Sequence, residues 1–98
     1  MFYVILFEDD ETRAEMRTSH MTDHLVFLEA NTAAIRGAGP LSDADTGAAA
    51  GGLWLVEAES LEAVQALYRA DPFWPTGLRK SVRVLRWRQV FANGHRLI

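Results

Sequence analysis

Apolar residues are grouped in short runs along the chain, and polar turns separate them. The run from Phe2 to Phe7 is rich in β-branched and aromatic residues and ends at the acidic stretch Glu8 to Glu11. Leu53 to Val56 is a second run of the same kind. Because neither run alternates with polar residues, we interpret both as strands of a sheet that is buried on both faces.

A helical pattern follows the first strand. Apolar residues recur at the spacing of one helix face at Met21, Leu25, Leu28 and Ile35. Thr22 or Ser19 is the predicted N-cap, and Gly37 is the predicted end. The helix is also expected to extend back over residues 12–17 after a kink.

A second helical pattern follows the Leu53 to Val56 strand. Ser60 is its predicted N-cap, and the predicted buried stripe consists of Leu61, Val64, Leu67 and Tyr68. We expect this helix to end at Asp71, because a residue that precedes a proline is disfavoured in the helical region. Residues 73–77 are expected to form a turn.

Shorter signals complete the pattern. Residues 37–41 predict a short strand, which Pro40 restricts to an edge or a strand end, and residues 42–51 predict a flexible loop. Residues 81–91 predict a last strand, with a β-bulge near Val84 because the parity of its apolar residues changes there. Asn93-Gly94 is typical of a hairpin turn.

The predicted order is βαββαβ, which indicates an α+β, ferredoxin-like antiparallel sheet with two helices on one face. Two helices cover only one face of such a sheet, whereas the apolar strands need cover on both. We therefore expect a homodimer that packs sheet to sheet, as in a dimeric α+β barrel. The alternative is a monomer with an exposed apolar patch, which soluble proteins avoid.

Composition narrows the function classes. Ninety-eight residues fit a single domain, 1–98, and a hydrophobic fraction of 49% is typical of a globular protein. The net charge of −3 gives no basic surface for nucleic acid, and the absence of cysteine excludes disulfides and thiolate metal sites. No apolar run is long enough to span a membrane or resembles a signal peptide, so we expect a cytoplasmic protein.

His24 and Asp71 are the candidate catalytic residues. His24 lies at the border of the predicted apolar helix face, and Asp71 precedes Pro72 at the end of the second helix. Antiparallel helices on one face of a sheet bring these two positions to the same end of the molecule, so we expect a hydrogen bond between them, directly or through one water. The alternatives are a structural histidine and an aspartate that only stabilises its turn.

Arg17, Phe73 and Trp74 are the candidate substrate-binding residues. The two aromatic side chains are suited to wall an apolar pocket, and packing against the second helix is the alternative. Arg17, like Arg86 and Arg88, is suited to hold an anion, and solvated surface is the alternative. No metal site is predicted, because the His20 and His24 pair lacks a suitably placed carboxylate, and no cofactor motif is present.

Several segments together resemble the YCII-related (YciI-like) family of small dimeric α+β barrel proteins. They are His24-Leu25 with Leu28, Gly37 to Leu41, Glu57 to Ala63, and Asp71-Pro72-Phe73 with Gly77-Leu78. The resemblance implies a ferredoxin-like fold, a two-fold dimer joined through the sheets, and a site at His24 and Asp71. A basic residue often precedes the family histidine by a few positions, whereas this chain has Met21 three positions before His24 and its nearest arginine is Arg17.

Two function hypotheses follow. In the first, the protein is a cofactor-free enzyme in which a His24/Asp71 acid–base pair transfers a proton on a small cyclic or aromatic metabolite, in an isomerisation, an elimination or a dehydrochlorination. The family example that the resemblance implies is a dehydrochlorinase of a chlorinated hydroquinone-type ring. In the second, the protein is a non-catalytic dimeric module that binds a small ligand or a protein through loop 42–51 and Glu8 to Glu11.

Overall fold

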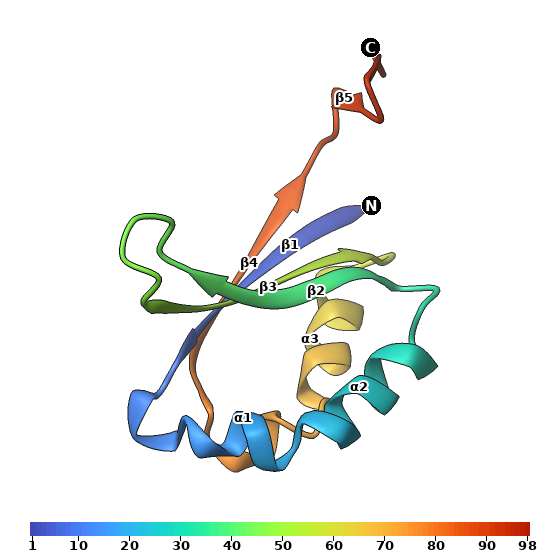
Figure 1. Ribbon diagram of the computed structural model, residues 1–98. Coiled ribbons are helices and arrows are strands. Elements are labelled where there is room, and N and C mark those ends of the chain that lie inside the picture. Colours follow the sequence, from blue (N-terminus) through green and yellow to red (C-terminus); the bar gives the residue numbers. More distant parts are fainter.

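Four antiparallel strands form one sheet in the computed structural model, which describes all 98 residues. From one edge to the other they are β2 (Ile35–Ser42), β3 (Ala49–Glu57), β1 (Phe2–Asp9) and β4 (Arg79–Trp87). The helices α1 (Glu15–Ser19), α2 (Met21–Ala30) and α3 (Leu61–Arg69) lie on one side of this sheet (Figure 1). The fold is therefore the predicted ferredoxin-like α+β fold.

The core lies between the sheet and the helices. Alternate residues of β1, which are Tyr3, Ile5 and Phe7, are buried on the helix side. Trp54 and Val56 of β3 join them, and Val64 and Tyr68 of α3 close the cluster. The residues between them on β1 and β3 face the opposite side and remain half-buried. Within one chain, the sheet is thus fully covered on one face only.

The first helix differs from the prediction at its C-terminal end. It ends at Ala30, not near Gly37, and the side chain of Asn31 donates a hydrogen bond to the carbonyl of Phe27 at 2.8 Å. Ile35 shares the helical spacing but belongs to β2, where it pairs with Val56. The predicted extension towards the N-terminus is present as the 3-10 turn η1 (Glu11–Arg13) and α1, which meets α2 at His20.

Several strand boundaries also differ from the predicted ones. β2 is longer than predicted, and β3 begins at Ala49, so the loop between them is shorter than residues 42–51. The bulge predicted near Val84 is wrong, because Val82, Val84, Leu85 and Trp87 fit one regular alternation opposite β1. The irregularity lies at the other end of β4, where the register shifts between Glu8 and Asp9.

The last residues form a small hairpin that projects away from the sheet (Figure 1). It consists of β5 (Phe91–Ala92) and β6 (His95–Arg96), which pair with each other. Asn93 and Gly94 join them with φ of 53° and 79°, so the predicted hairpin is confirmed. No helix of this structure has the length and apolar character required to cross a membrane.

Candidate functional site

His24 and Asp71 are brought together by the packing of α2 and α3 on one face of the sheet. Nδ1 of His24 lies 2.7 Å from Oδ1 of Asp71, although the residues are 47 positions apart in the sequence. Both side chains are buried. The expected hydrogen bond is therefore present and direct. Because an ionised carboxylate only accepts, Nδ1 carries the proton and Nε2 is the nitrogen left for another partner.

The imidazole of His24 is held on several sides. The residue stands in the first turn of α2, where its backbone N–H donates to the carbonyl of His20 at 2.9 Å. Its ring stacks on Phe73 with 4.0 Å between centroids and 15° between planes. The ring of Trp54 lies next to the imidazole, with 6.2 Å between the ring centroids. A ring fixed by packing and by a hydrogen bond is suited to proton transfer at its free nitrogen.

Asp71 stands in the turn that ends α3. Pro72 follows it, and the 3-10 turn η2 (Trp74–Thr76) carries the chain towards β4. Its Oδ1 accepts the backbone N–H of Phe73 at 3.2 Å as well as the hydrogen bond from His24. The turn-stabilising role and the contact with His24 are thus combined in one oxygen, which fixes the carboxylate before any ligand arrives.

A cleft of about 100 Å³ opens beside His24. It is lined by residues of α1, α2, β2, β3 and β4, which are Arg17, Met21, His24, Leu25, Leu28, Ala38, Gly39, Pro40, Trp54 and Arg79. The volume is below that of a pocket for a drug-sized ligand and matches one small functional group or the edge of a ring. Its lining is largely apolar, with one imidazole and two guanidinium groups.

The two arginines of the cleft share one carboxylate. Asp9 accepts from Arg17 with Oδ2 and from Arg79 with Oδ1, the latter at 2.9 Å. Cζ of the Arg79 guanidinium lies 4.2 Å from the ring centroid of Phe7 and 5.3 Å from that of Phe73. Burial lowers the pKa of Arg79, although Asp9 acts in the opposite direction. An arginine so placed remains protonated and brings a fixed positive charge to the cleft.

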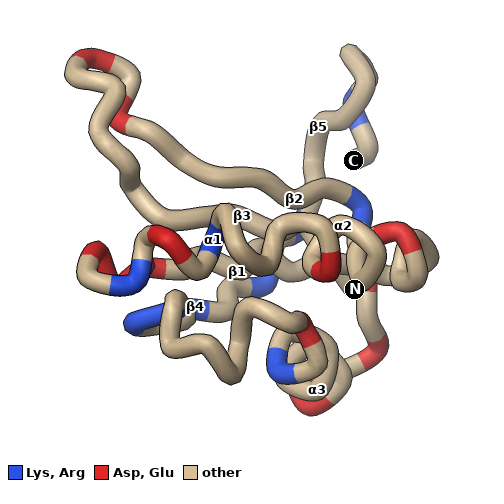
Figure 2. Tube along the Cα trace, turned by 60° about the horizontal axis from the view of Figure 1, so that its bottom comes forward, with Lys and Arg blue, Asp and Glu red and all other residues tan.

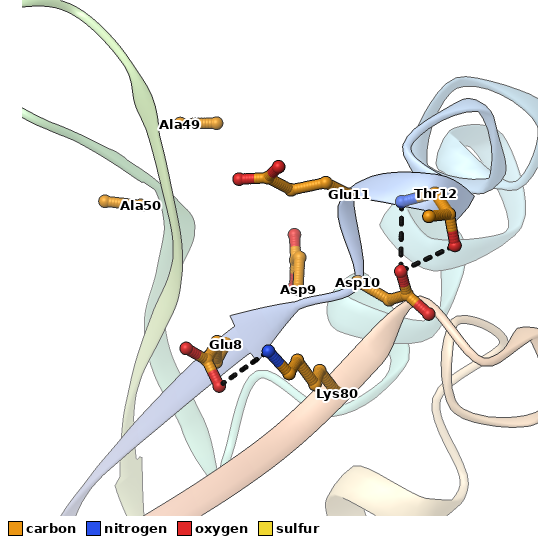
Figure 3. Close-up of a pocket in the computed structure, with 8 residues that line it drawn as sticks. All are labelled: Glu8, Asp9, Asp10, Glu11, Thr12, Ala49, Ala50 and Lys80. Atoms are coloured by element: carbon orange, nitrogen blue, oxygen red, sulfur yellow. Dashed lines mark hydrogen bonds and ion pairs between the residues drawn. The ribbon is translucent and has the colours of Figure 1, made fainter.

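Charged positions of both signs gather where β1 runs into α1 and where β4 begins (Figure 2). A hollow of about 570 Å³ lies at this end but does not include His24. Glu8 to Thr12, Ala49, Ala50 and Lys80 line it, so the acidic run and the first residues of β3 meet here (Figure 3).

Three of the four carboxylates of this hollow, those of Glu8, Asp9 and Asp10, are engaged within the protein. Asp10 accepts from the backbone N–H and the hydroxyl of Thr12 at 2.9 Å and 2.6 Å, and these bonds lower the pKa of Asp10 (Figure 3). Glu8 lies 4.0 Å from Lys80, and Asp9 holds the two arginines. No cluster of His, Asp and Glu side chains in the structure is arranged to hold a metal ion. The His24 cleft is therefore the better candidate for chemistry.

Of the residues expected to bind substrate, only Arg17 lines this cleft. Phe73 is fully buried behind the His24 ring, and Trp74 packs on Tyr68 with 5.0 Å between centroids. Arg86 lies beside the open face of the sheet, and Arg88 is exposed after the end of β4. The structure thus brings Arg17, Phe73, His24 and Asp71 to one region and places Trp74 outside it.

Sequence reasoning missed Arg79 and Asp9. Asp9 continues the inward alternation of β1, but it was interpreted as part of the acidic stretch that ends the strand. Val84 and Val82 lie on the inner face of β4, and a regular alternation would place Lys80 on the same face. The register shift at Glu8/Asp9 instead pairs Asp9 with Arg79 and leaves Lys80 as the extra residue. A bulge of one residue therefore decides which basic side chain enters the cleft.

Comparisons with known proteins identify relatives over most of the chain. The model of the YCII-related domain matches residues 1–88. Protein YciI of Escherichia coli and Protein YciI of Shigella flexneri are each 36% identical over 98 residues, which cover 93% of this chain and 100% of theirs.

A solved structure is similar over most of the chain. It is the 5-chloro-2-hydroxyhydroquinone dehydrochlorinase TftG of Burkholderia phenoliruptrix, in complex with 2,5-dihydroxybenzoquinone. The two proteins are 32% identical with a TM-score of 0.79, and the match covers 90% of this chain and 94% of the other. By family model, sequence and structure, this chain belongs to the YCII-related domain family.

Proposed function

We propose that the protein is a cofactor-free enzyme that transfers a proton on a small cyclic or aromatic metabolite. His24 is the general base and then the general acid, and Asp71 orients its ring and stabilises its charged form. The observation that carries this proposal is the buried 2.7 Å contact between Nδ1 of His24 and Oδ1 of Asp71, at the wall of the cleft. Side chains that point at each other favour an enzyme over a non-catalytic module.

The reaction begins when Nε2 of His24 accepts a proton from a carbon or hydroxyl of the substrate, whose electron pair stays on the substrate. The imidazolium that forms is paired with the Asp71 carboxylate. In an isomerisation, Nε2 returns the proton to a different atom of the substrate. In an elimination, the electron pair expels a leaving group such as chloride, and the imidazolium later gives its proton to water.

Family membership and the likeness to a dehydrochlorinase support a small-molecule enzyme of this kind. The proposed substrate class, a small cyclic or aromatic compound, is suggested by the similar protein TftG. TftG is a dehydrochlorinase of 5-chloro-2-hydroxyhydroquinone, and its structure holds 2,5-dihydroxybenzoquinone. Arg17 lines the cleft and is the proposed contact for an anionic substrate oxygen, while Phe73 supports the back of the His24 ring.

A substrate panel tests the proposal. Purified protein is incubated with 5-chloro-2-hydroxyhydroquinone and with unchlorinated hydroxyhydroquinones and lactones, and chloride release and ultraviolet spectra are followed. We expect turnover of at least one compound, and we expect His24→Ala to abolish it. Identical behaviour of the wild type and His24→Ala on every compound that reacts contradicts the catalytic assignment.

We also propose that two copies pack through the open face of the sheet. Leu85 and Trp87 of β4 are 37% and 42% exposed there, although both are large and apolar. Together with Val4, Leu53, Leu55 and Arg86 they line a shallow hollow of about 420 Å³. A second sheet that packs on this face removes the apolar surface from water.

A further inference from the structure

One apolar stripe of α2 forms a wall of the cleft. Met21, Leu25 and Leu28 stand at the i, i+4 and i+7 spacing of a single helix face, and all three line the cleft. Leu28 also packs against the core, whereas Leu25 is 48% exposed. A lone exposed leucine is common on protein surfaces, but this one borders the same cleft as a buried imidazole. The stripe therefore offers apolar surface to a ligand of that cleft.

The facing wall belongs to β2, which is an edge strand of the sheet. Ala38 of β2 pairs with Trp54 of β3, and residues directly opposite each other in antiparallel strands point to the same face of the sheet. Trp54 is buried in the core on the helix side. The methyl group of Ala38 therefore points to the helix side as well, and both residues line the cleft.

The helix-facing residues of β2 become smaller where the cleft opens. Ile35, opposite Val56, is buried in the core. Because the register shifts between Ile35 and Gly37, the next residue of β2 that faces the helices is Ala38, and it is exposed. A large side chain thus closes the space between β2 and the helices at the first position, and a methyl group leaves the space open at the second.

We infer that the ring of the substrate enters the cleft between the α2 stripe and Ala38, and that the small side chain of Ala38 sets the width of ring that fits. The cleft of about 100 Å³ admits one edge of a single ring, and that edge reaches the wall that His24 forms. The inference rests on the proposed function only for the statement that the His24 cleft is where substrate binds.

Binding of phenol, and of 3,5-dimethylphenol as the same ring widened by two methyl groups, tests the inference without turnover. The ¹H–¹³C methyl resonances of Ala38 and Leu25 are followed by NMR during both titrations. We expect phenol to shift them in a saturable way, because both residues line the cleft. Leu53 lines the hollow on the open face of the sheet, and saturable shifts of its methyl groups alone overturn the inference.

The affinity ratio of the two phenols reports the width of the cleft. Ala38→Val adds two methyl groups in a strand that tolerates β-branched residues, and we expect it to weaken 3,5-dimethylphenol about tenfold more than phenol. Ala38→Gly should change the ratio in the opposite direction, and it gives the answer if circular dichroism shows Ala38→Val unfolded. Gly37→Ala is the matched control. Gly37 lies opposite Leu55 and has open space where its Cβ would be, so the ratio should stay that of the wild type.

The outcomes separate this inference from the catalytic proposal. An affinity ratio that is the same in the wild type, Ala38→Val and Ala38→Gly overturns the inference and leaves the His24 assignment standing. A ratio that follows the size of residue 38 supports the inference, even if no compound of the substrate panel is converted and the catalytic proposal fails. His24→Ala should retain phenol binding within about threefold, since its effect is on proton transfer.

Discussion

The rings of His24 and Phe73 lie face to face, with centroids 4.0 Å apart and planes 15° apart. Phe73 has no exposed surface, and its backbone N–H donates to the same Asp71 oxygen that His24 contacts. One residue therefore fixes both members of the pair, the imidazole through its ring and the carboxylate through its amide.

Replacing Phe73 by leucine tests this support. The substitution keeps an apolar side chain but removes the stacked face, so we expect the free energy of unfolding to fall by about 1–3 kcal/mol. Urea denaturation gives the value. Phe91→Leu is the matched control, because Phe91 is 59% exposed in the terminal hairpin and its loss should change stability by less than about 0.5 kcal/mol. Equal effects of the two substitutions contradict a supporting role for Phe73.

The Asp71 carboxylate is predicted to set the tautomer of His24. In the wild type the neutral ring should carry its proton on Nδ1, since the carboxylate it faces only accepts. In Asp71→Asn the side chain no longer requires a donor at Nδ1, so the population with the proton on Nε2 should rise. Long-range ¹H–¹⁵N NMR at a pH where the ring is neutral distinguishes the two forms. The same tautomer in both proteins contradicts the assignment.

Trp54 and Leu55 are neighbours on β3 with opposite roles. Trp54 is 1% exposed in the core, whereas Leu55 faces the open side of the sheet. We expect Leu55→Asp to convert a dimer into a monomer, and Trp54→Asp to unfold the chain, because a charge is then buried without a partner. Sedimentation at micromolar concentration and circular dichroism separate the outcomes. A stable wild-type monomer contradicts the proposed interface.

Asp43 provides a test of acid stability. Its Oδ1 accepts the backbone N–H groups of Thr46 and Asp45, and the bond from Thr46 is the main cause of the lowered pKa of Asp43. A carboxyl whose pKa is lowered by folding stabilises the protein at pH values above its pKa in the unfolded chain, 3.8. This stabilisation is lost as the pH falls through the lower pKa of the folded protein.

Asp43→Asn removes this titration and keeps an acceptor oxygen. The wild type should therefore lose more free energy of unfolding than Asp43→Asn when the pH is lowered from about 6 to about 3. Urea denaturation across this range measures both slopes. Parallel slopes contradict the assignment of the shift to the Asp43 turn.

Much of the fold could be predicted because it depends on local signals. The apolar runs of β1 and β3, the Ser60 cap and the Asn93-Gly94 turn each indicate their element directly, and Ser60 does accept from the N–H of Ala63. The end of α2 could not be predicted in this way, because Ile35 satisfies the helical spacing while it belongs to an edge strand.

The candidate site, like the fold, could be predicted from the sequence only in part. Its topology brings His24 and Asp71 together, so a predicted βαββαβ order was sufficient to expect their hydrogen bond. Arg79 enters the cleft only because the register shifts at Asp9, and no local pattern of β4 indicates that shift. Side chains that depend on a bulge in a neighbouring strand are beyond what periodicity can predict.

The turnover number of His24→Asn tests the central claim most directly. On a substrate that the wild type converts, kcat should fall by about 10²-fold to 10⁴-fold while KM changes little, because only the proton transfer is removed. His20→Asn is the matched control, a second histidine four positions earlier that does not line the cleft, and its kcat should equal that of the wild type. A His24→Asn protein that is folded and retains wild-type kcat contradicts the proposed role of the His24/Asp71 pair.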